Sequence, residues 1–349
     1  MFKRTAALML SLLLMFAFVG CKKEVEVDVE KPKESSSEET IPEPEPQFAI
    51  NPLTGVENLD LTKPNDRPVA ITINNISVAQ PVQTGLREAD IVYETLVEGG
   101  ITRLVALYQD ISKIEKIGTV RSARYPFIDL AMGHNAIYVH HGQDSYHAGP
   151  HLNDIDRYVV SENNAGMRDY SNGLSSEHTL YAYGDKLWQA LVDRGFNTVK
   201  SNPSNWVNFA EDELSLESIA NTVTVPFSTS YVTKFVYNPD TKQYVRYFGD
   251  TQRTDYVTGQ ILEFKNIFVL KTSIHTYPNC TDGYGHQQVN LDSGDGYYCV
   301  NGTYKPIRWS KGASYNGFVF TNIDGTPLSV NCGNSWVCIP NLSANVTFG

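Results

Sequence analysis

Short apolar runs separated by turn residues fill the chain after residue 68, and they constrain its fold more than any other feature. The segments 91–93 and 104–108 are rich in the β-branched and aromatic residues that favour strands. From about residue 220 onward, similar runs are separated by turns such as Asn238-Pro239-Asp240 and Asp324-Gly325. None of these runs reaches the roughly 20 apolar residues that a membrane-spanning helix needs. We therefore expect a sheet-rich globular fold.

Two segments of the first half have the spacing of amphipathic helices instead. Residues 125–132 and 183–194 carry apolar residues at helical spacing, and Gly195 follows the second segment as a typical helix end. About 300 residues remain for folding, enough for two domains of ordinary size. We expect an α+β protein, with a layered mixed α/β N-terminal domain at residues 49–215 and a smaller, mostly β C-terminal domain at residues 216–349.

The first 21 residues have the pattern of a bacterial export signal. Lys3 and Arg4 precede an uncharged apolar run that is too short to span a membrane and fits the apolar region of a signal peptide. The run ends in Phe18-Val19-Gly20-Cys21, which resembles the lipobox, the string in which the cysteine receives a lipid and becomes the new N-terminus. An ordinary secretory signal that is cleaved elsewhere is the alternative. We expect residues 1–21 to be a lipoprotein signal peptide, with a lipid on Cys21 that anchors the chain to the outer face of the bacterial cytoplasmic membrane.

Residues 22–48 have the composition of a tether. They consist mainly of Glu, Lys, Ser and Pro, and such a segment buries too little apolar surface to fold. We expect a disordered acidic, proline-rich tether with a mean span of roughly 30 Å. The folded part would therefore work close to the membrane.

The charge of the chain limits its partners. It has 28 basic and 39 acidic residues, a net charge of −11, which disfavours nucleic acid and other polyanions. Besides the cytoplasmic membrane, reached through the lipid anchor, the expected partners are peptidoglycan fragments, an anionic small molecule or an envelope protein. We expect no cofactor.

Four cysteines follow Cys21, all in the strand-rich second half. An even number of cysteines in an exported domain favours two disulfides. The turn at Gly333-Asn334 places Cys332 opposite Ser335, so we expect Cys332 and Cys338 to pair with Cys280 and Cys299 in either order. Inert thiols, or a nucleophilic thiol at Cys332, are the alternatives.

Polar residues gather around the strands of the first half, beside the flexible Gly99-Gly100 pair that allows a ligand to approach the backbone. Paired arginines suit carboxylate or phosphate recognition, because each guanidinium offers a planar fork of donors. The alternatives are an ion-pair network that fixes the sheet ends, and an acid/base pair of Glu94 and Glu98. The candidate ligand-binding residues are Asn75, Glu94, Glu98, Thr102, Arg103, Arg121, Ser122, Arg124, His140 and His178.

A histidine-rich segment follows the strand at residues 136–139. His140, Asp144, His147 and His151 have the spacing of one helical face, which would suit zinc. Gly142 and the Gly149-Pro150 pair disfavour a continuous helix. We therefore expect a strand that ends in a loop, with no metal, and His140 and His178 as candidate members of the binding pocket.

Several strings in the first half are similar to those of a known family. These are Asn-Pro-Leu-Thr-Gly at 51–55, Arg-Pro-Val-Ala at 67–70, Ala-Asp-Ile-Val-Tyr-Glu at 89–94, Glu-Gly-Gly-Ile-Thr-Arg at 98–103 and Arg-Ser-Ala-Arg at 121–124. Together and in this order they resemble the YerB-like lipoprotein family, and the resemblance extends over residues 50–349. It implies a layered mixed α/β fold with a smaller C-terminal domain. It implies no reaction, since the family has none established.

Two classes of function follow from these observations. The first is a membrane-anchored binding or scaffolding module of the cell envelope with an Arg/Glu-lined polar pocket. The second is a cell-wall-modifying hydrolase or transferase that uses Glu98, a pocket histidine and the arginines. The chain has no recognisable catalytic motif, such as a Gly-x-Ser-x-Gly nucleophile elbow, so we favour the first.

Overall fold

The computed structural model describes residues 47–200, 205–278, 280 and 283–349. The expected signal peptide, Cys21 and nearly all of the expected tether lie outside the described residues. The described residues form one compact unit. No helix of the described part has the length and apolar character needed to cross a bilayer.

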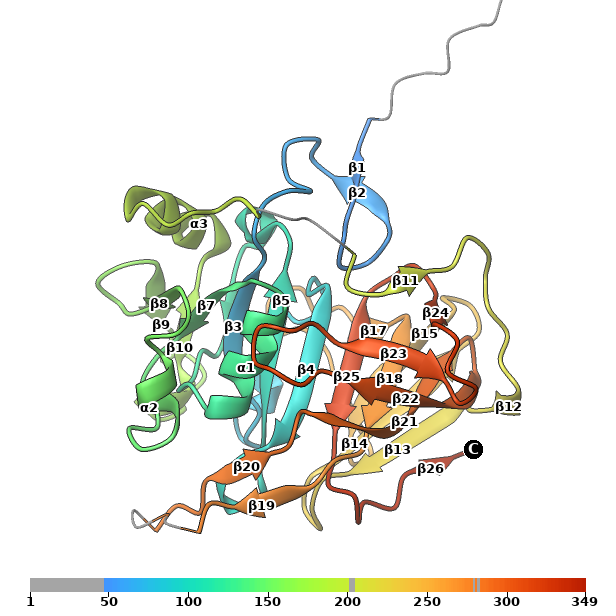
Figure 1. Cartoon of the computed structure of the whole chain (residues 1–349). Helices are drawn as coiled ribbons and strands as arrows, with labels where there is room; N and C mark the ends of the chain where they lie inside the picture. The colour runs from blue at the N-terminus through green and yellow to red at the C-terminus, as the bar shows by residue number, and fades with distance from the viewer. Residues whose placement is uncertain (1–46, 201–204, 279, 281–282) are drawn as a thin grey trace, which may run out of the picture. The chain divides into compact units, whose positions relative to one another are not determined.

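An eleven-stranded mixed sheet forms the centre of the molecule (Figure 1). Its strands come from both halves of the chain. In sheet order they are β12 (Ser218–Ile219), β22 (Thr303–Ser310), β21 (Ser293–Val300), β18 (Asn266–Leu270), β25 (Ser335–Ile339), β4 (Ile91–Leu96), β5 (Thr102–Tyr108), β3 (Val69–Asn74), β7 (Ile137–His140) and β8 (Arg157–Val159), and β23 (Val319–Asn322) pairs with β22.

The two halves meet where β25 is inserted between β18 and β4. β25 runs parallel to both neighbours, with Trp336 opposite Val92 on one side and Ile267 on the other. All five residues of β25 are buried, as expected for a strand covered on both faces. The sheet is therefore continuous across the boundary between the expected N-terminal and C-terminal domains.

A six-stranded antiparallel sheet packs on one face of the central sheet. It contains β16 (Thr251–Gln252), β15 (Gln243–Phe248), β14 (Val232–Asn238), β13 (Thr222–Pro226) and β26 (Thr347–Phe348), and β17 (Glu263–Phe264) pairs with β15. Trp336 lies between the two sheets, with its ring edge-on to Phe264 and Phe235 at centroid distances of 5.0 and 5.9 Å. This aromatic contact contributes apolar burial between the two sheets.

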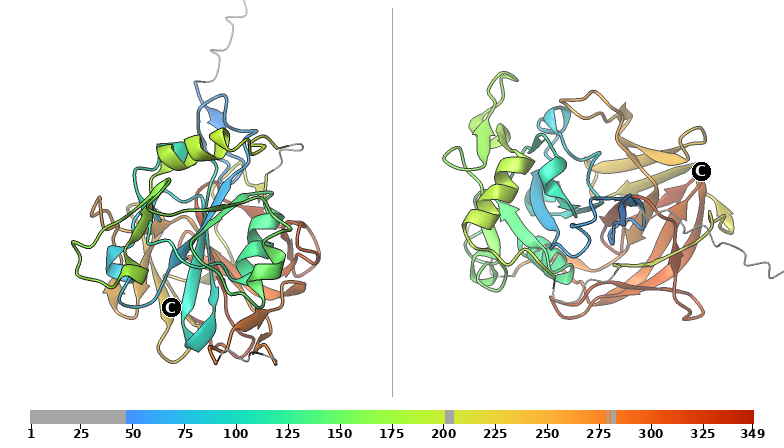
Figure 2. Two further views of the ribbon diagram at one scale, coloured as in Figure 1. Left: turned by 90° about the vertical axis from the view of Figure 1, so that its left-hand side faces the viewer. Right: turned by 90° about the horizontal axis from the view of Figure 1, so that it is seen from above.

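The helix α1 (Tyr125–Gly133) packs on the opposite face of the central sheet. It begins after the extended residue Arg124 with Pro126 in its first turn, and its buried side includes Phe127, Ile128 and Leu130. α3 (Gly184–Asp193) has its buried side at Leu187 and Leu191. Both helices confirm the helical spacing at 125–132 and 183–194. Viewed from above, the green helical segments lie on one side of the molecule and the yellow-to-red strands on the other (Figure 2).

The remaining elements are short. They are α2 (Ala148–His151), the 3₁₀ turns η1 (Gln80–Val82), η2 (Glu98–Gly100), η3 (Ile111–Lys113) and η4 (Ser176–His178), and the small sheets β1 (Ala49–Ile50) with β2 (Glu57–Leu59), β6 (Ile117–Gly118) with β10 (Leu180–Ala182) and β9 (Gly166–Arg168), β11 (Asn208–Phe209) with β24 (Ser329–Val330), and β19 (Ile274–Thr276) with β20 (Gln287–Val289). The protein is thus mostly sheet with few helices. We expected a layered α/β arrangement for the first half. One face of the sheet is covered by α1, as that arrangement requires, but the face that carries Trp336 is covered by a second sheet.

The expected disulfides are absent from the described residues, because Cys299, Cys332 and Cys338 are all free thiols. Cys299 on β21 lies opposite Ile267, and Cys338 on β25 lies opposite Val269, so β18 separates the two cysteines. Two strand spacings amount to about 9.5 Å, beyond the roughly 7 Å limit between the Cα atoms of a disulfide. The disulfide prediction is therefore wrong for these cysteines. The order of the strands keeps Cys299 and Cys338 apart, and the spacing of cysteines in the sequence does not reveal that order.

Candidate functional site

The candidate ligand-binding residues lie on both faces of the central sheet. Successive residues of a strand point to opposite faces, and the register pairs Glu94 with Leu104 but Arg103 with Thr95 and Asn74. Glu94 therefore faces the second sheet, whereas Arg103 and Asn74 lie on the face that carries α1. The ten residues do not form one pocket.

Glu94 is the centre of a buried cluster between the two sheets. Its Oε1 atom accepts hydrogen bonds from Asn75 Nδ2 at 3.0 Å, Thr102 Oγ1 at 2.8 Å and Thr233 Oγ1 at 3.0 Å. Its Oε2 atom accepts a hydrogen bond from the indole Nε1 of Trp336 at 3.1 Å. All five side chains are buried, so this cluster offers no surface to a ligand.

Arg246 of β15 provides the positive charge that faces Glu94, and the sequence analysis did not identify it. Its guanidinium lies over the ring of Trp336, 4.6 Å from the centroid, and Nη2 donates to Asn75 Oδ1 at 3.4 Å. Burial lowers the pKa of Arg246, and the charge of Glu94 acts in the opposite direction. No local signal marks Arg246, because its role depends on the packing of β15 against β4.

A second polar cluster, here called the rim cluster, contains Glu98, Arg103, Arg121, Arg124 and Glu177. Glu98 lies in η2, the turn between β4 and β5, where Gly99 and Gly100 have positive φ angles of 66° and 71°. Its Oε1 atom accepts hydrogen bonds from Arg103 Nη2 at 3.0 Å and Arg124 Nη2 at 2.5 Å, and Oε2 accepts one from Arg124 Nε at 2.7 Å. Arg124 thus grips the carboxylate with two donors.

The arginines determine the charge state of Glu98. Burial alone would raise the pKa of its carboxyl group, but Arg103 and Arg124 hold that pKa well below its usual range. Burial, together with the charge of Arg124, lowers the pKa of Arg103 to about 9. Glu98 is therefore ionised at neutral pH and has no proton to donate as a general acid. Glu94, on the other face of the sheet, cannot form an acid/base pair with it.

Arg121 is the outermost arginine of the rim cluster. Its Nη2 and Nη1 atoms donate to the side chain and the carbonyl of Glu177 at 3.0 and 3.1 Å. The Glu177 side chain is 55% exposed and that of Arg121 is 23% exposed. The Nε atom of Arg121 has no hydrogen-bond partner among the described residues. The rim cluster holds three guanidinium groups and two carboxylates, a surplus of one positive charge.

His178 and Asn74 line the same side of the rim cluster. His178 Nδ1 lies 2.9 Å from Asn74 Nδ2, and Nε2 lies 3.6 Å from Glu177 Oε1. Burial lowers the pKa of His178. The ring therefore adds little positive charge to the cluster at neutral pH.

Residues 121–124 are held against the histidine loop that follows β7. The His141 amide donates to the Arg121 carbonyl, and the Ala123 amide donates to the Gly142 carbonyl, each at 3.0 Å. Ser122 contributes its own carbonyl, which accepts a hydrogen bond from Arg103 Nη1 at 3.0 Å. The loop thus positions Arg121 and Arg124 at the edge of the sheet.

His140 ends β7 beneath this segment. Its Nδ1 atom donates to the Gly142 carbonyl at 2.7 Å, and burial lowers its pKa to about 4. Its Nε2 atom is buried and has no partner among the described residues. His140 is therefore a neutral ring that supports the turn, and it lies below the surface at which a ligand would arrive.

The second half of the chain also reaches the rim cluster. His286, next to β20, lies 3.5 Å from Glu98 Oε2 and 3.7 Å from Asp144 Oδ1, and Tyr277 stacks on His147 at 3.7 Å. Sequence reasoning missed His286 and Tyr277, which only the hairpin of β19 and β20 brings here. His151 lies apart from the other histidines of its segment, beside Tyr125, and the described residues contain no group of side chains suited to a metal ion.

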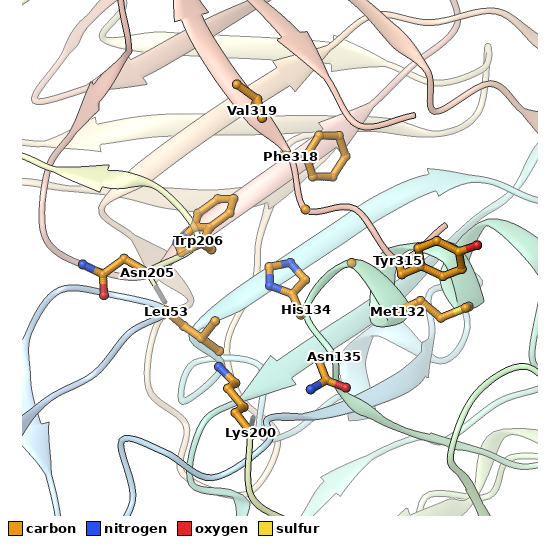
Figure 3. Close-up of a pocket in the computed structure, with 12 residues that line it drawn as sticks. Leu53, Met132, His134, Asn135, Lys200, Asn205, Trp206, Tyr315, Phe318 and Val319 are labelled. Atoms are coloured by element: carbon orange, nitrogen blue, oxygen red, sulfur yellow. The ribbon is translucent and has the colours of Figure 1, made fainter. Parts of the chain in front are cut away.

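None of the ten candidate ligand-binding residues lines any of five pockets on the described residues. One of the pockets lies at the other end of α1, around His134 (Figure 3).

Comparison with protein families identifies the class of this protein. Residues 53–197 match the family described as "Protein of unknown function (DUF3048) N-terminal domain", and residues 223–337 match the corresponding C-terminal domain. The chain belongs to this family. The two matched segments meet in the central sheet. β4, in the N-terminal match, pairs with β25, which begins within the C-terminal match and ends two residues beyond it.

Relatives within the family confirm the resemblance that the motifs indicated. The protein described as "Putative lipoprotein YerB" from Bacillus subtilis (strain 168) is 31% identical over 311 residues, which are 84% of this chain and 87% of that protein. The crystal structure of the YerB protein from Bacillus subtilis matches with a TM-score of 0.73 and 28% sequence identity, over 86% of this chain and 99% of that one.

Proposed function

We propose that this protein is a lipoprotein, anchored through Cys21 to the outer face of the cytoplasmic membrane, whose folded part binds an anionic ligand of the cell envelope at the rim cluster. The anchor is supported by the lipobox-like string that ends in Cys21 and by the description of the Bacillus subtilis relative as a lipoprotein. The expected tether would hold the rim cluster close to the membrane and the inner cell wall.

The observation that carries the binding role is the surplus positive charge of the rim cluster. Arg103 and Arg124 share the carboxylate of Glu98, and Arg121 is held only by the largely exposed Glu177. An incoming carboxylate or phosphate can replace Glu177 on Arg121 without moving a buried group. A carboxylate or phosphate suits this exchange, because a guanidinium offers it a planar fork of donors.

The enzyme alternative receives less support from the geometry. Glu98 is held ionised by two arginines, and His140 lies buried with a depressed pKa. Neither group is poised near neutral pH at an accessible position, which general acid/base catalysis requires. Binding needs only the charge and the fixed geometry of the arginines.

The decisive experiment measures binding of a peptidoglycan disaccharide-peptide to the full chain in detergent by titration calorimetry. We expect saturable binding of the fragment with free carboxylates and none of the same fragment with its carboxylates amidated. Arg121→Gln should weaken binding about 10- to 100-fold, because it removes a charged hydrogen-bond donor. Glu177→Gln should tighten binding, because it removes the competing carboxylate.

The matched control is Arg308→Gln, which removes a 57% exposed arginine on β22 outside the rim cluster. It should leave the affinity unchanged. Equal affinity of Arg121→Gln and the wild-type protein, or equal binding of the amidated fragment, would exclude the rim cluster as the site.

A further inference from the structure

The pocket at the C-terminal end of α1 has the features of a second binding site. Its volume is about 410 Å³, within the size range of small-molecule sites. Trp206, Phe318 and Tyr315 line it together with His134, the residue that follows α1 (Figure 3). Arg124, just before α1, belongs to the rim cluster. Nine helical residues span about 13.5 Å, so α1 separates the two sites.

Lys200 brings an uncompensated positive charge to this pocket. The residue is only 9% exposed, and its Nζ atom forms no hydrogen bond or ion pair with any described residue. Figure 3 shows its ammonium directed towards Leu53 and His134. Burial lowers the pKa of Lys200 to about 8, as expected for an amine without a counter-charge. None of the described lining residues is acidic.

The other groups of the pocket leave this charge unopposed. His134 Nε2 is held by the hydroxyl of Tyr93 at 2.7 Å, and burial, with the nearby charges of Lys200 and Lys311, lowers the pKa of His134 to about 3. His134 is therefore neutral. The Nζ atom of Lys311 is engaged by the carbonyls of Ala313 and Ser314.

Trp206 gives the pocket an aromatic wall with an unused donor. Its ring packs against Phe268, Phe320 and His134 at centroid distances of 5.6, 5.8 and 6.0 Å, which fixes its orientation. Its Nε1 atom is buried and has no acceptor among the described residues. A buried indole N–H without an acceptor, beside an ammonium without a counter-charge in the same pocket, indicates a polar ligand, because an unsatisfied buried donor is costly.

We propose that this pocket binds a small ring-bearing carboxylate, with the carboxylate on Lys200 and the ring against Trp206 and Phe318. An aromatic wall provides apolar contact area for the ring, and the ammonium provides the charge contact. The site is separate from the rim cluster and does not depend on the function proposed for it.

The test uses phenylacetate and phenylacetamide, which differ in charge but hardly in shape. Binding to the full chain in detergent is followed by isothermal titration calorimetry. We expect saturable binding of phenylacetate and at least about tenfold weaker binding of phenylacetamide. Acetate, which has the charge without the ring, should bind far more weakly than phenylacetate. The affinity for phenylacetate should fall as the pH rises through about 8, because the Lys200 ammonium loses its proton there.

Lys200→Met removes the charge and keeps an apolar chain of similar length. Because the Lys200 ammonium forms no ion pair with a described residue, this change should not destabilise the fold, yet it should weaken phenylacetate binding about 10- to 100-fold. Lys186→Met, on the exposed side of α3, is the matched control and should have no effect.

A second pair of variants tests the pocket without touching a buried side chain. Val319 lines the pocket and is 58% exposed. Val319→Glu should weaken phenylacetate binding severalfold by repulsion, whereas Val319→Gln should not. The proposal is overturned if phenylacetate shows no saturable binding up to about 10 mM, if phenylacetamide binds equally well, or if Lys200→Met retains the wild-type affinity.

Discussion

Glu94 and Glu98 show how strongly the surroundings of a residue decide its role. They are four residues apart and belong to neighbouring motif strings, so the sequence suggested a shared pocket. Glu94 is fully buried and accepts hydrogen bonds from both sheets, whereas Glu98 lies at the sheet edge between two arginines. The difference arises because β4 ends between them and the chain turns at Gly99 and Gly100.

At the residue scale, Glu94→Gln should destabilise the fold while leaving the rim cluster intact. The variant keeps the shape of the side chain but removes the negative charge that faces the buried Arg246. Breaking a direct buried ion pair costs about 3–5 kcal/mol, and Glu94 acts on Arg246 through its charge without such a pair, so we expect a loss of about 1–3 kcal/mol. Urea denaturation should show this loss in the free energy of unfolding.

Two further variants make this prediction specific. Glu94→Gln combined with Arg246→Met should recover part of the loss, because no uncompensated charge then remains. Glu177→Gln, at an exposed carboxylate, should change the free energy of unfolding by less than about 1 kcal/mol. A fully stable Glu94→Gln variant would argue against a structural role for this carboxylate.

At the scale of elements, the segment 121–124 depends on the loop that follows β7. Gly142 has a φ of +76°, and a Cβ atom at this position would lie 2.8 Å from Ser122 Oγ. The glycine therefore allows the close approach that places Arg121 and Arg124 beside Glu98. A side chain at residue 142 would push the arginine segment away from the sheet edge.

Gly142→Ala should therefore lower the free energy of unfolding by more than the cost of placing alanine at a positive φ angle. Gly173→Ala is the matched control, since Gly173 has a φ of +72° and open space where a Cβ would lie. In both variants the left-handed conformation should lower the free energy of unfolding by about 1–2 kcal/mol. At residue 142 alone, the contact with Ser122 should lower it by roughly 1–3 kcal/mol more.

The contact with Ser122 can be isolated in thermal or urea unfolding by a double variant. Combining Gly142→Ala with Ser122→Ala removes the close Oγ atom and should recover the added cost. If Gly142→Ala and Gly173→Ala prove equally stable, the segment 121–124 does not depend on this contact.

At the scale of the whole molecule, the two family domains share one sheet. β25 of the second half lies between β18 and β4, so neither half completes the central sheet alone. Glu94, Thr233, Arg246 and Trp336 add a polar connection between the halves. The domain boundary expected from the sequence therefore lies within a molecule whose central sheet is continuous.

We accordingly expect both halves to unfold in one transition. Hydrogen exchange in urea, read by mass spectrometry on peptides from β5 and β21, should give the same free energy of opening for both. Val337→Ala, at a fully buried position of β25, should lower both values equally by about 2 kcal/mol. The exposed change Val192→Ala on α3 should lower neither by a comparable amount. Unequal effects of Val337→Ala on the two peptides would mean that the halves are separate units.

Local patterns in the sequence were sufficient to predict the main helices and strands and to recognise the family. The helices at 125–133 and 184–193, and strands such as β4, β5 and β18, follow from periodicity and from turn residues close in the chain. The motif strings were sufficient to recognise the family, because their combination and order depend only on the sequence. The contacts of Glu98 with Arg103 and Arg124 could also be expected from the sequence, since these residues come from motif strings within a short stretch.

Only the tertiary structure decided which residues meet across the sheets. Strand order and contacts between distant segments decide the insertion of β25 beside β4 and the separation of Cys299 from Cys338. They also decide the stacking of Arg246 on Trp336 and the pocket around Lys200. Helical and strand periodicity report only local burial, and many strand orders satisfy the same pattern. The sequence by itself determined the elements and the family, and the long-range packing of those elements decided where each charge lies.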